Sequence, residues 1–284
     1  MKRTLRFDKI LLGFFKTLGI GGIVVIFSMP YLWLIGSAFK PRDEIFAHIY
    51  PFSWKTFIPL RPTLDNIISV FTEANLGSAM LLSFGIAIAT VIISLFICSM
   101  MAFVLARLEF PGRNVFFFLI LATMMIPFET RLVPLFFVMQ GLKLDNTLAA
   151  VFLPWVADAF IIFLLRQHFA ELPDELYDAA IVDGCSHFGV YWKIMLPNLT
   201  PVLVSAALIK FIWSWDAFIW PLIILRDPKL RVVQVAIAFL FGDQRILWGQ
   251  VFAGAFVSTL PILILFLALQ RYYISGMTTS GIKG

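Results

Sequence analysis

Long uncharged apolar stretches alternate with short polar ones along the 284 residues of this chain. A helix needs about 20 predominantly apolar residues to cross the hydrocarbon core of a bilayer. Six segments approach or exceed that length, at about residues 18–38, 77–106, 114–140, 147–166, 200–225 and 246–270. The pattern predicts an all-α integral membrane protein whose six transmembrane helices form a single domain over residues 1–284.

The third segment departs from a simple span. Only 15 uncharged residues separate Arg113 from Glu129, which is roughly 22 Å of helix and too short to cross a bilayer. Either this helix ends below the outer surface, or it breaks and continues over about residues 132–142. Broken backbone at membrane depth is tolerated only where protein or a water-filled cavity satisfies its polar groups.

Composition agrees with a membrane protein, because 61% of the residues are hydrophobic and 14% are charged, against about 25% charged in soluble domains. Basic residues precede the first segment and should stay in the cytoplasm. With six spans, both termini and the loop of residues 170–199 are then cytoplasmic. The net charge of +5 needs no nucleic-acid partner. The two cysteines, Cys98 and Cys185, have no metal-ligand spacing, and we expect no metal site.

The loop of residues 170–199 is an acidic interruption in this apolar chain. Five acids face the single cation Lys193, for a net charge of −4, and they are Glu171, Asp174, Glu175, Asp178 and Asp183. Helices that lie on a bilayer usually carry basic residues, which meet anionic lipid. Lipid headgroups should repel this loop, whereas a basic groove on a soluble partner should attract it.

Local signals predict two short helices in this loop. Pro173 suits the first position of a helix, where its missing N–H costs nothing. Gly184 is a natural stop signal, and Ser186 can cap a second helix. Pro197 should end that second helix. We therefore expect two helices, separated at the glycine, to form a docking surface.

The loop also carries a specific motif. An Asp-Ala-Ala triplet is followed after three residues by glycine and after nine more by Ile-Met-Leu-Pro. The spacing resembles the EAA loop of ABC importer permeases, with Asp178 in place of the usual glutamate. The residues that match are Asp178, Ala179, Ala180, Gly184, Ile194, Leu196 and Pro197. From Leu64 to Gly284 the chain resembles carbohydrate-importer permeases, most closely the smaller six-helix permease of maltose-like systems.

The resemblance implies a type I ABC importer permease fold and a non-enzymatic subunit of a prokaryotic inner-membrane importer, most simply one for a sugar or oligosaccharide. It implies a second permease in a heterodimer, two ATP-binding subunits that hold ATP and magnesium, and an extracytoplasmic binding protein. The loop would convert closure of the ATP-binding subunits into alternating access. This chain has no G-x-x-x-x-G-K-[ST] sequence, so we expect it to bind neither ATP nor another cofactor.

Ionisable and aromatic residues inside the predicted spans are candidates for the substrate path. They are Glu129, Arg131, Asp158, Lys210, Trp213, Trp215 and Asp216, with Trp220 nearby. Asp216 stands where such permeases often have asparagine. Each candidate has a structural alternative: an ion pair at the outer interface for Glu129 and Arg131, interfacial anchoring for the tryptophans, and pairing with an acid on a neighbouring helix for Lys210.

Other functions stay open at this point. The same machinery could import glycerol phosphate or another polar anion. An ion-coupled secondary transporter could use Asp158, Lys210 and Asp216 as a relay, although such proteins need no acidic docking loop and usually have more helices arranged in repeats. A membrane enzyme ranks last, because the sequence shows no cluster of histidine, cysteine or serine.

Overall fold

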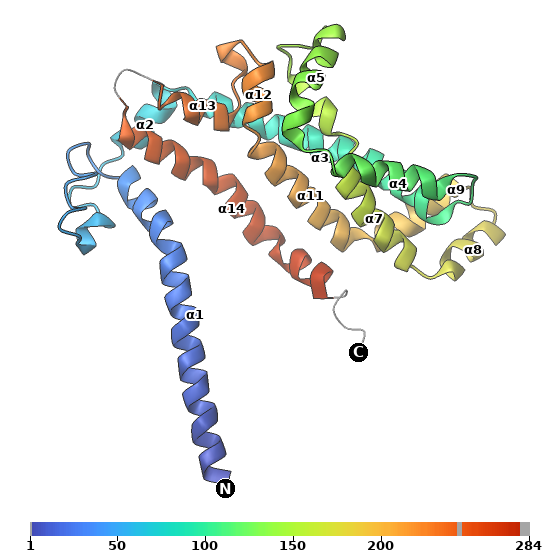
Figure 1. The fold of residues 1–284 in the computed structure, drawn as a ribbon, viewed down its shortest axis with the longest axis horizontal. Coiled ribbons are helices and arrows are strands. Elements are labelled where there is room, and N and C mark those ends of the chain that lie inside the picture. Colours follow the sequence, from blue (N-terminus) through green and yellow to red (C-terminus); the bar gives the residue numbers. More distant parts are fainter. Residues whose placement is uncertain (1, 243–245, 279–284) are drawn as a thin grey trace. The chain divides into compact units, whose positions relative to one another are not determined.

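The computed structural model describes residues 2–242 and 246–278, with the backbone alone for 2–12, 14–15 and 271–278. Regular structure in these residues is entirely helical (Figure 1). The α-helices are α1 (Lys2–Ala38), α2 (Asp65–Thr72), α3 (Leu76–Arg107), α4 (Arg113–Met124), α5 (Phe128–Gly141), α6 (Leu148–Phe152), α7 (Ala159–Glu171), α8 (Asp174–Val182), α9 (His187–Val190), α10 (Leu196–Asn198), α11 (Thr200–Trp215), α12 (Ile219–Ile224), α13 (Val233–Phe239) and α14 (Trp248–Thr278). Short 3-10 turns are η1 (Trp54–Thr56), η2 (Leu153–Trp155) and η4 (Pro228–Leu230), and η3 (Tyr191–Met195) is a π turn.

Three of the described helices are long and apolar enough to cross a membrane alone: the Lys16–Ala38 part of α1, α3, and the Trp248–Gln270 part of α14. Three pairs of shorter helices pass the same test together. Their bends are 102° between α4 and α5, 42° between η2 and α7, and 82° between α10 and α11. The described chain thus holds three candidate spans, or up to six if each bent pair forms one.

The third predicted segment breaks and continues, as one of the two alternatives from the sequence requires. α4 ends at Met124, and α5 begins at Phe128. Pro127 precedes α5 with extended backbone (ψ 142°). Proline also biases the residue before it away from helical geometry, so it separates the two helices.

The fifth predicted segment, 200–225, is not one helix. α11 ends at Trp215, and a separate helix α12 begins at Ile219. Pro221 gives the physical reason, because a proline inside a continuous helix would lack its N–H and clash with the carbonyl four residues earlier. In the first turn of a new helix these costs disappear. The first predicted segment, 18–38, is the C-terminal part of the longer helix α1.

Internal contacts divide the chain into two compact units. The first comprises Met1–Leu76 and Ile237–Thr259, and the second comprises Gly77–Ala236 and Leu260–Gly284. In the second unit, one buried cluster joins α3 to α7, α8 and η3 and includes Phe103, Phe169, Ala180 and Tyr191. Another joins α3, α5, α6 and α12 and includes Ile86, Met139, Ala150, Trp220 and Ile224. Such van der Waals packing is what holds membrane helices together.

Within the first unit, one asparagine secures the end of α1. Asn66 Nδ2 donates to the carbonyl oxygens of Ala38 (3.1 Å) and Lys40 (2.7 Å). Carbonyl groups at a helix C-terminus otherwise lack partners. Gly249 of α14 lies directly against this amide, since a Cβ atom at position 249 would overlap the Asn66 side chain.

We therefore expect Gly249→Ala to destabilise the protein by about 1–3 kcal/mol, because overpacking would displace the Asn66 amide. Thermal unfolding in detergent measures the effect. Gly85→Ala in α3 is the matched control, since a Cβ atom there meets no other group within 4 Å. Equal unfolding temperatures for the two variants would contradict this role for Asn66.

Candidate functional site

The predicted docking loop folds into two helical pieces after α7. The first is α8, and the second runs without interruption from α9 through η3 to α10. Ser186 caps the second piece as expected, because its Oγ accepts a hydrogen bond from Gly189 N at 3.2 Å. Pro173 is the residue before α8 rather than its first helical residue.

Pro197 does not end the second piece, contrary to expectation. It lies inside α10, and the chain turns by 82° only after Asn198. The preceding turn is a π turn, in which Leu196 N–H donates to Tyr191 O. A π turn is wider than an α turn, which makes room for a proline ring that would otherwise clash.

Gly184 separates the two pieces with left-handed backbone (φ 84°). Gly184 N–H donates to Ile181 O, and Cys185 N–H donates to Ala180 O, both at 3.0 Å. This pair of bonds is the Schellman motif, which closes a helix at a residue with positive φ. Glycine adopts that conformation without the steric cost that other residues incur. The glycine therefore sets the direction in which the second piece leaves α8.

The exposed side of this loop combines acids with apolar side chains. We call it the loop surface, and its exposed members are Asp174, Glu175, Leu176, Asp178, Ala179, Ile181, Val182, Asp183, Gly184, Phe188 and Trp192. Val182 is 86% exposed, and the rings of Phe188 and Trp192 stack at 6.3 Å. The motif residue Pro197 is also exposed, Ile194 and Leu196 are half-buried, and Ala180 is buried. Tyr191 and Met195 face inward, into the cluster around Phe103.

A cavity of about 620 Å³ lies in the second unit, beside the breaks that precede α5 and α7 and the break that follows α11. Its lining is mostly aromatic and aliphatic, with a few polar groups, as in small-molecule sites generally. The described lining residues are Thr90, Phe128, Val151, Trp155, Asp158, Lys210, Trp213, Ser214, Asp216, Ala217, Phe218, Ile219 and Trp220.

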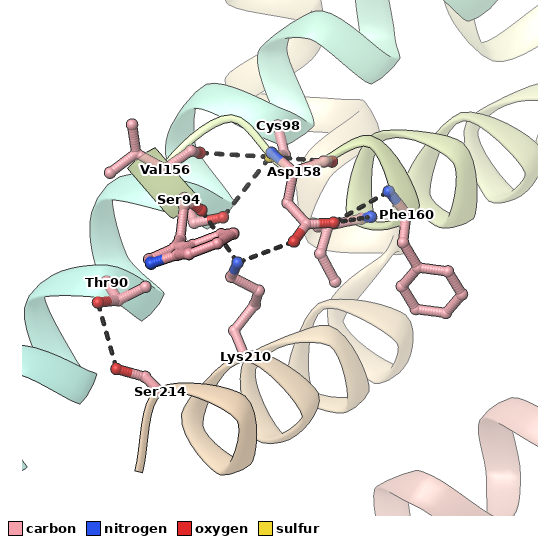
Figure 2. A network of polar contacts seen from close by, with 10 residues as sticks. Thr90, Ser94, Cys98, Val156, Asp158, Phe160, Lys210 and Ser214 are labelled. Carbon is pink, nitrogen blue, oxygen red and sulfur yellow. Dashed lines mark hydrogen bonds and ion pairs between the residues drawn. The ribbon is translucent and has the colours of Figure 1, made fainter. Parts of the chain in front are cut away.

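An ion pair forms one wall of the cavity (Figure 2). Lys210 Nζ lies 3.0 Å from Asp158 Oδ2 and donates to Trp155 O at 2.9 Å. Lys210 is only 2% exposed. Asp158 Oδ1 in turn accepts from the N–H groups of Phe160 (2.9 Å) and Ile161 (3.2 Å), which caps α7. The pair thus satisfies the free polar groups at the break between η2 and α7.

Two residues of α3, Cys98 and Thr90, make further contacts around the ion pair. Cys98 Sγ accepts from Asp158 N at 3.3 Å and approaches Val156 O at 3.5 Å, and Thr90 Oγ1 lies 3.4 Å from Ser214 Oγ. Cys98 of α3 and Lys210 of α11 therefore both contact the break between η2 and α7. The structural alternative for Lys210, pairing with an acid on a neighbouring helix, is confirmed.

The structure separates the other candidates for the substrate path. Trp213 is 49% exposed and lines the cavity, whereas Trp215 is 1% exposed and stacks on Phe211 outside the lining. Asp216 lies at the cavity and accepts from Gln234 Nε2 at 3.1 Å. Glu129 and Arg131 are exposed and are not among the described lining residues.

Sequence reasoning missed several lining residues. Trp155 and Asp158 are on opposite sides of the break between η2 and α7, so the spacing along a continuous helix does not bring them together. Thr90 and Ser214 are small hydroxyl residues in apolar runs and gave no signal of their own. In the described part of the chain, no group of three or more His, Cys, Asp or Glu side chains could hold a metal ion.

Known proteins match this chain over most of its length. The family described as binding-protein-dependent transport system inner membrane component matches residues 94–279. The arabinooligosaccharides transport system permease protein AraQ of Halalkalibacterium halodurans is 39% identical over 279 residues, which cover 96% of this chain and 98% of that protein. The sn-glycerol-3-phosphate transport system permease protein UgpE of Salmonella typhi is 32% identical over 275 residues, which cover 94% and 96%.

A solved structure shares the fold. The crystal structure of a bacterial ABC transporter involved in the import of the acidic polysaccharide alginate contains a chain that matches with a TM-score of 0.81 and 19% identity. The match covers 93% of this chain and 96% of that one. The proteins matched are transport permeases rather than enzymes. The chain belongs to the family of inner-membrane components of binding-protein-dependent transport systems, and it is a permease subunit of an ABC importer.

Proposed function

We propose that this permease imports a sugar or an oligosaccharide by alternating access, driven by separate ATPase subunits that dock on the loop surface. The proposed docking rests on which side chains that surface exposes. Exposed apolar side chains such as Val182, Phe188 and Trp192 lie among carboxylates. This combination suits a soluble partner whose groove is apolar with a basic rim.

The proposed complex contains this chain, a second permease of related fold, two ATPase subunits that bind ATP and magnesium, and an extracytoplasmic binding protein. This chain itself holds no cofactor. Both termini lie in the cytoplasm, as the basic N-terminal residues favour, and residues 170–199 then face the ATPase subunits. Single-cysteine labelling from each side of the membrane tests this orientation: Cys185 should react only from the cytoplasmic side.

Reconstitution in proteoliposomes tests the energy source. Uptake of arabinotriose should require the binding protein outside and ATP inside. An imposed proton or sodium gradient without ATP should drive none. Gradient-driven uptake would instead support an ion-coupled carrier that uses Asp158, Lys210 and Asp216 as a relay.

The charge of the cavity favours an uncharged substrate over a polar anion. Among its described lining residues, one cation faces two carboxylates, for a net formal charge of −1. Two hydrogen bonds engage Lys210 Nζ, which also lies 5.8 Å from the centre of the Trp213 ring. The ammonium group therefore has few free donors for hydrogen bonds to a phosphate. Glycerol phosphate is the second candidate substrate, because the chain is 32% identical to a glycerol-phosphate permease.

Trp213 is the ring best placed to stack on a sugar. Its other neighbours are the Phe160 ring, 5.6 Å away, and the Lys210 ammonium. We expect Trp213→Ala to lower the initial rate of arabinotriose uptake about threefold to tenfold, the equivalent of one aromatic contact. Phe118→Ala, which removes an exposed ring of α4 outside the lining, should leave the rate unchanged.

The same assay separates the two substrate classes. Labelled sn-glycerol 3-phosphate should not enter by the wild-type complex, and Asp216→Asn should not reduce sugar uptake. If glycerol phosphate were taken up and arabinotriose were not, the sugar assignment would fail.

A further inference from the structure

Arg107, the last residue of α3, bonds to the end of α7 and the start of α8. Arg107 Nη1 donates to Asp174 Oδ1 in the first turn of α8, and Nη2 donates to the carbonyl oxygens of Phe169 (2.6 Å) and Leu172. Phe169 and Leu172 lie at the C-terminus of α7, where carbonyl groups lack partners within the helix. The Arg107 side chain is 5% exposed, against 85% for Asp174. Arg107 therefore ties α3 to the end of α7 and the start of α8.

A single face of α3 carries further contacts to the same loop. Ser99 Oγ lies 2.8 Å from Tyr191 Oη, and the Phe103 ring lies 5.4 Å from Tyr191 and 6.2 Å from Tyr177. Ser99, Phe103 and Arg107 are spaced by four residues, so they lie one above another on the helix. Figure 1 shows α8 and α9 beside this end of α3. Both pieces of the loop are thus attached to α3.

The other end of this stretch of α3 reaches the cavity. Thr90 belongs to the cavity lining and contacts Ser214 of α11, and Cys98 contacts the break before α7. Thr90 and Arg107 are separated by roughly 25 Å of helix, and this helix is continuous from Leu76 to Arg107. α3 is therefore one continuous helix that contacts the loop near Arg107 and lines the cavity at Thr90.

We propose that Arg107 is a positioning residue, which transmits movement of the loop surface to α3 and so to the cavity. The proposal rests on the function given above. A docked subunit that displaces α8 must either carry Arg107 with it or break a charge-assisted hydrogen bond, which is the strong class of hydrogen bond. Loss of the guanidinium uncouples ATP hydrolysis from transport and leaves the docking contacts themselves in place.

Arg113 supplies a matched control in the same turn of chain. A basic residue at the cytoplasmic end of a span is ordinarily explained by charge bias alone. Arg113 fits that explanation, because the hydrogen bond described for it returns to Leu108 O within its own turn, at 3.3 Å. The two arginines share charge and location and differ in their contact with α8.

The test measures sugar imported per ATP hydrolysed by equal amounts of the complete, reconstituted complex, with arabinotriose as the probe. Arg107→Gln should lower this ratio by about fivefold or more, which corresponds to the usual range of coupling between sites. The ATPase subunit should still co-purify in wild-type amount. Arg107→Lys keeps the charge but loses the several N–H donors of the guanidinium, so it should give an intermediate ratio. The control Arg113→Gln should give the wild-type ratio.

A wild-type ratio in Arg107→Gln overturns the proposal. Loss of the ATPase subunit from that variant also overturns it, because Arg107 would then serve docking rather than transmission. If Arg107→Gln does not assemble, Asp174→Asn decides, since its side chain is exposed. A lowered ratio with the ATPase subunit retained in wild-type amount supports the proposal, and a wild-type ratio or loss of the subunit overturns it. Failure of the proposed function appears separately, as absence of ATP-driven uptake by the wild-type complex.

Discussion

Gly184→Asp is expected to abolish ATP-driven uptake and to release the ATPase subunit from detergent extracts. Position 184 has a φ of 84°, which costs a residue with a Cβ about 1–2 kcal/mol. Steric overlap within this chain adds nothing, because a Cβ there meets no other group within 4 Å. The larger loss comes from a side chain in the middle of the docking contact, because it would keep the partner from approaching the backbone at position 184. Removing a central contact of this kind costs roughly 2–4 kcal/mol, or about 30- to 1,000-fold in affinity.

Co-purification with a tagged ATPase subunit measures the effect, and uptake into proteoliposomes confirms it. Gly112→Asp is the matched control, since Gly112 also has a φ of 84° but lies before α4, outside the loop. Asp178→Lys should act in the same direction through its charge, whereas Glu109→Lys, at another exposed acid, should not. If Gly184→Asp still retains the ATPase subunit and transports normally, the loop surface is not the docking site.

Lys210→Met is expected to be the most destabilising single substitution in the cavity wall, at about 3–5 kcal/mol, because it leaves a carboxylate without its partner. It removes both the pair with Asp158 and the donor to Trp155 O. Those groups hold the break between η2 and α7 in place. The unfolding temperature in detergent should fall sharply, and uptake should fall with the amount of folded protein.

A compensated double variant distinguishes an unpaired charge from lost packing. Lys210→Met combined with Asp158→Ser removes both charges and keeps a hydroxyl that can cap α7. Replacement of both members of a buried ion pair is often nearly neutral, so the double variant should recover most of the lost stability. Lys229→Met, at an exposed lysine, should change little. Equal destabilisation in the single and double variants would show that charge pairing is not the reason.

The backbone of the loop of residues 170–199 could be predicted from sequence in most of its detail. Helix stops and caps depend on a few neighbouring residues, and the signals at Gly184 and Ser186 both led to the observed backbone. The prediction that Pro197 ends the second helix was wrong, because the π turn before it accommodates the proline ring. That turn buries Tyr191 and Met195 in the cluster that includes α3. The position of α3 depends on residues far away in the sequence, so rules for neighbouring residues cannot predict it.

The cavity could be predicted only as a set of candidates. Trp213 and Trp215 are two positions apart on a helix, so they face nearly opposite directions, and the sequence does not say which direction is the cavity. The packing of other helices around α11 decided it: Trp215 is 1% exposed, whereas Trp213 lines the cavity. Similarly, three candidate acids were available to Lys210, and the approach of α11 to the break before α7 selected Asp158.

The sequence by itself determined the membrane-spanning character, the charge of the loop and the spacing of its motif, and it predicted the break before α5 as one of two alternatives. These properties depend on transfer of residues out of water and on hydrogen bonds between near neighbours along the chain. The tertiary structure decided which acid neutralises Lys210, which tryptophan faces the cavity and that Arg107 joins α3 to the loop. The ion pair and the Arg107 bonds link residues 52 to 67 positions apart, and only the packing of whole helices brings such residues together.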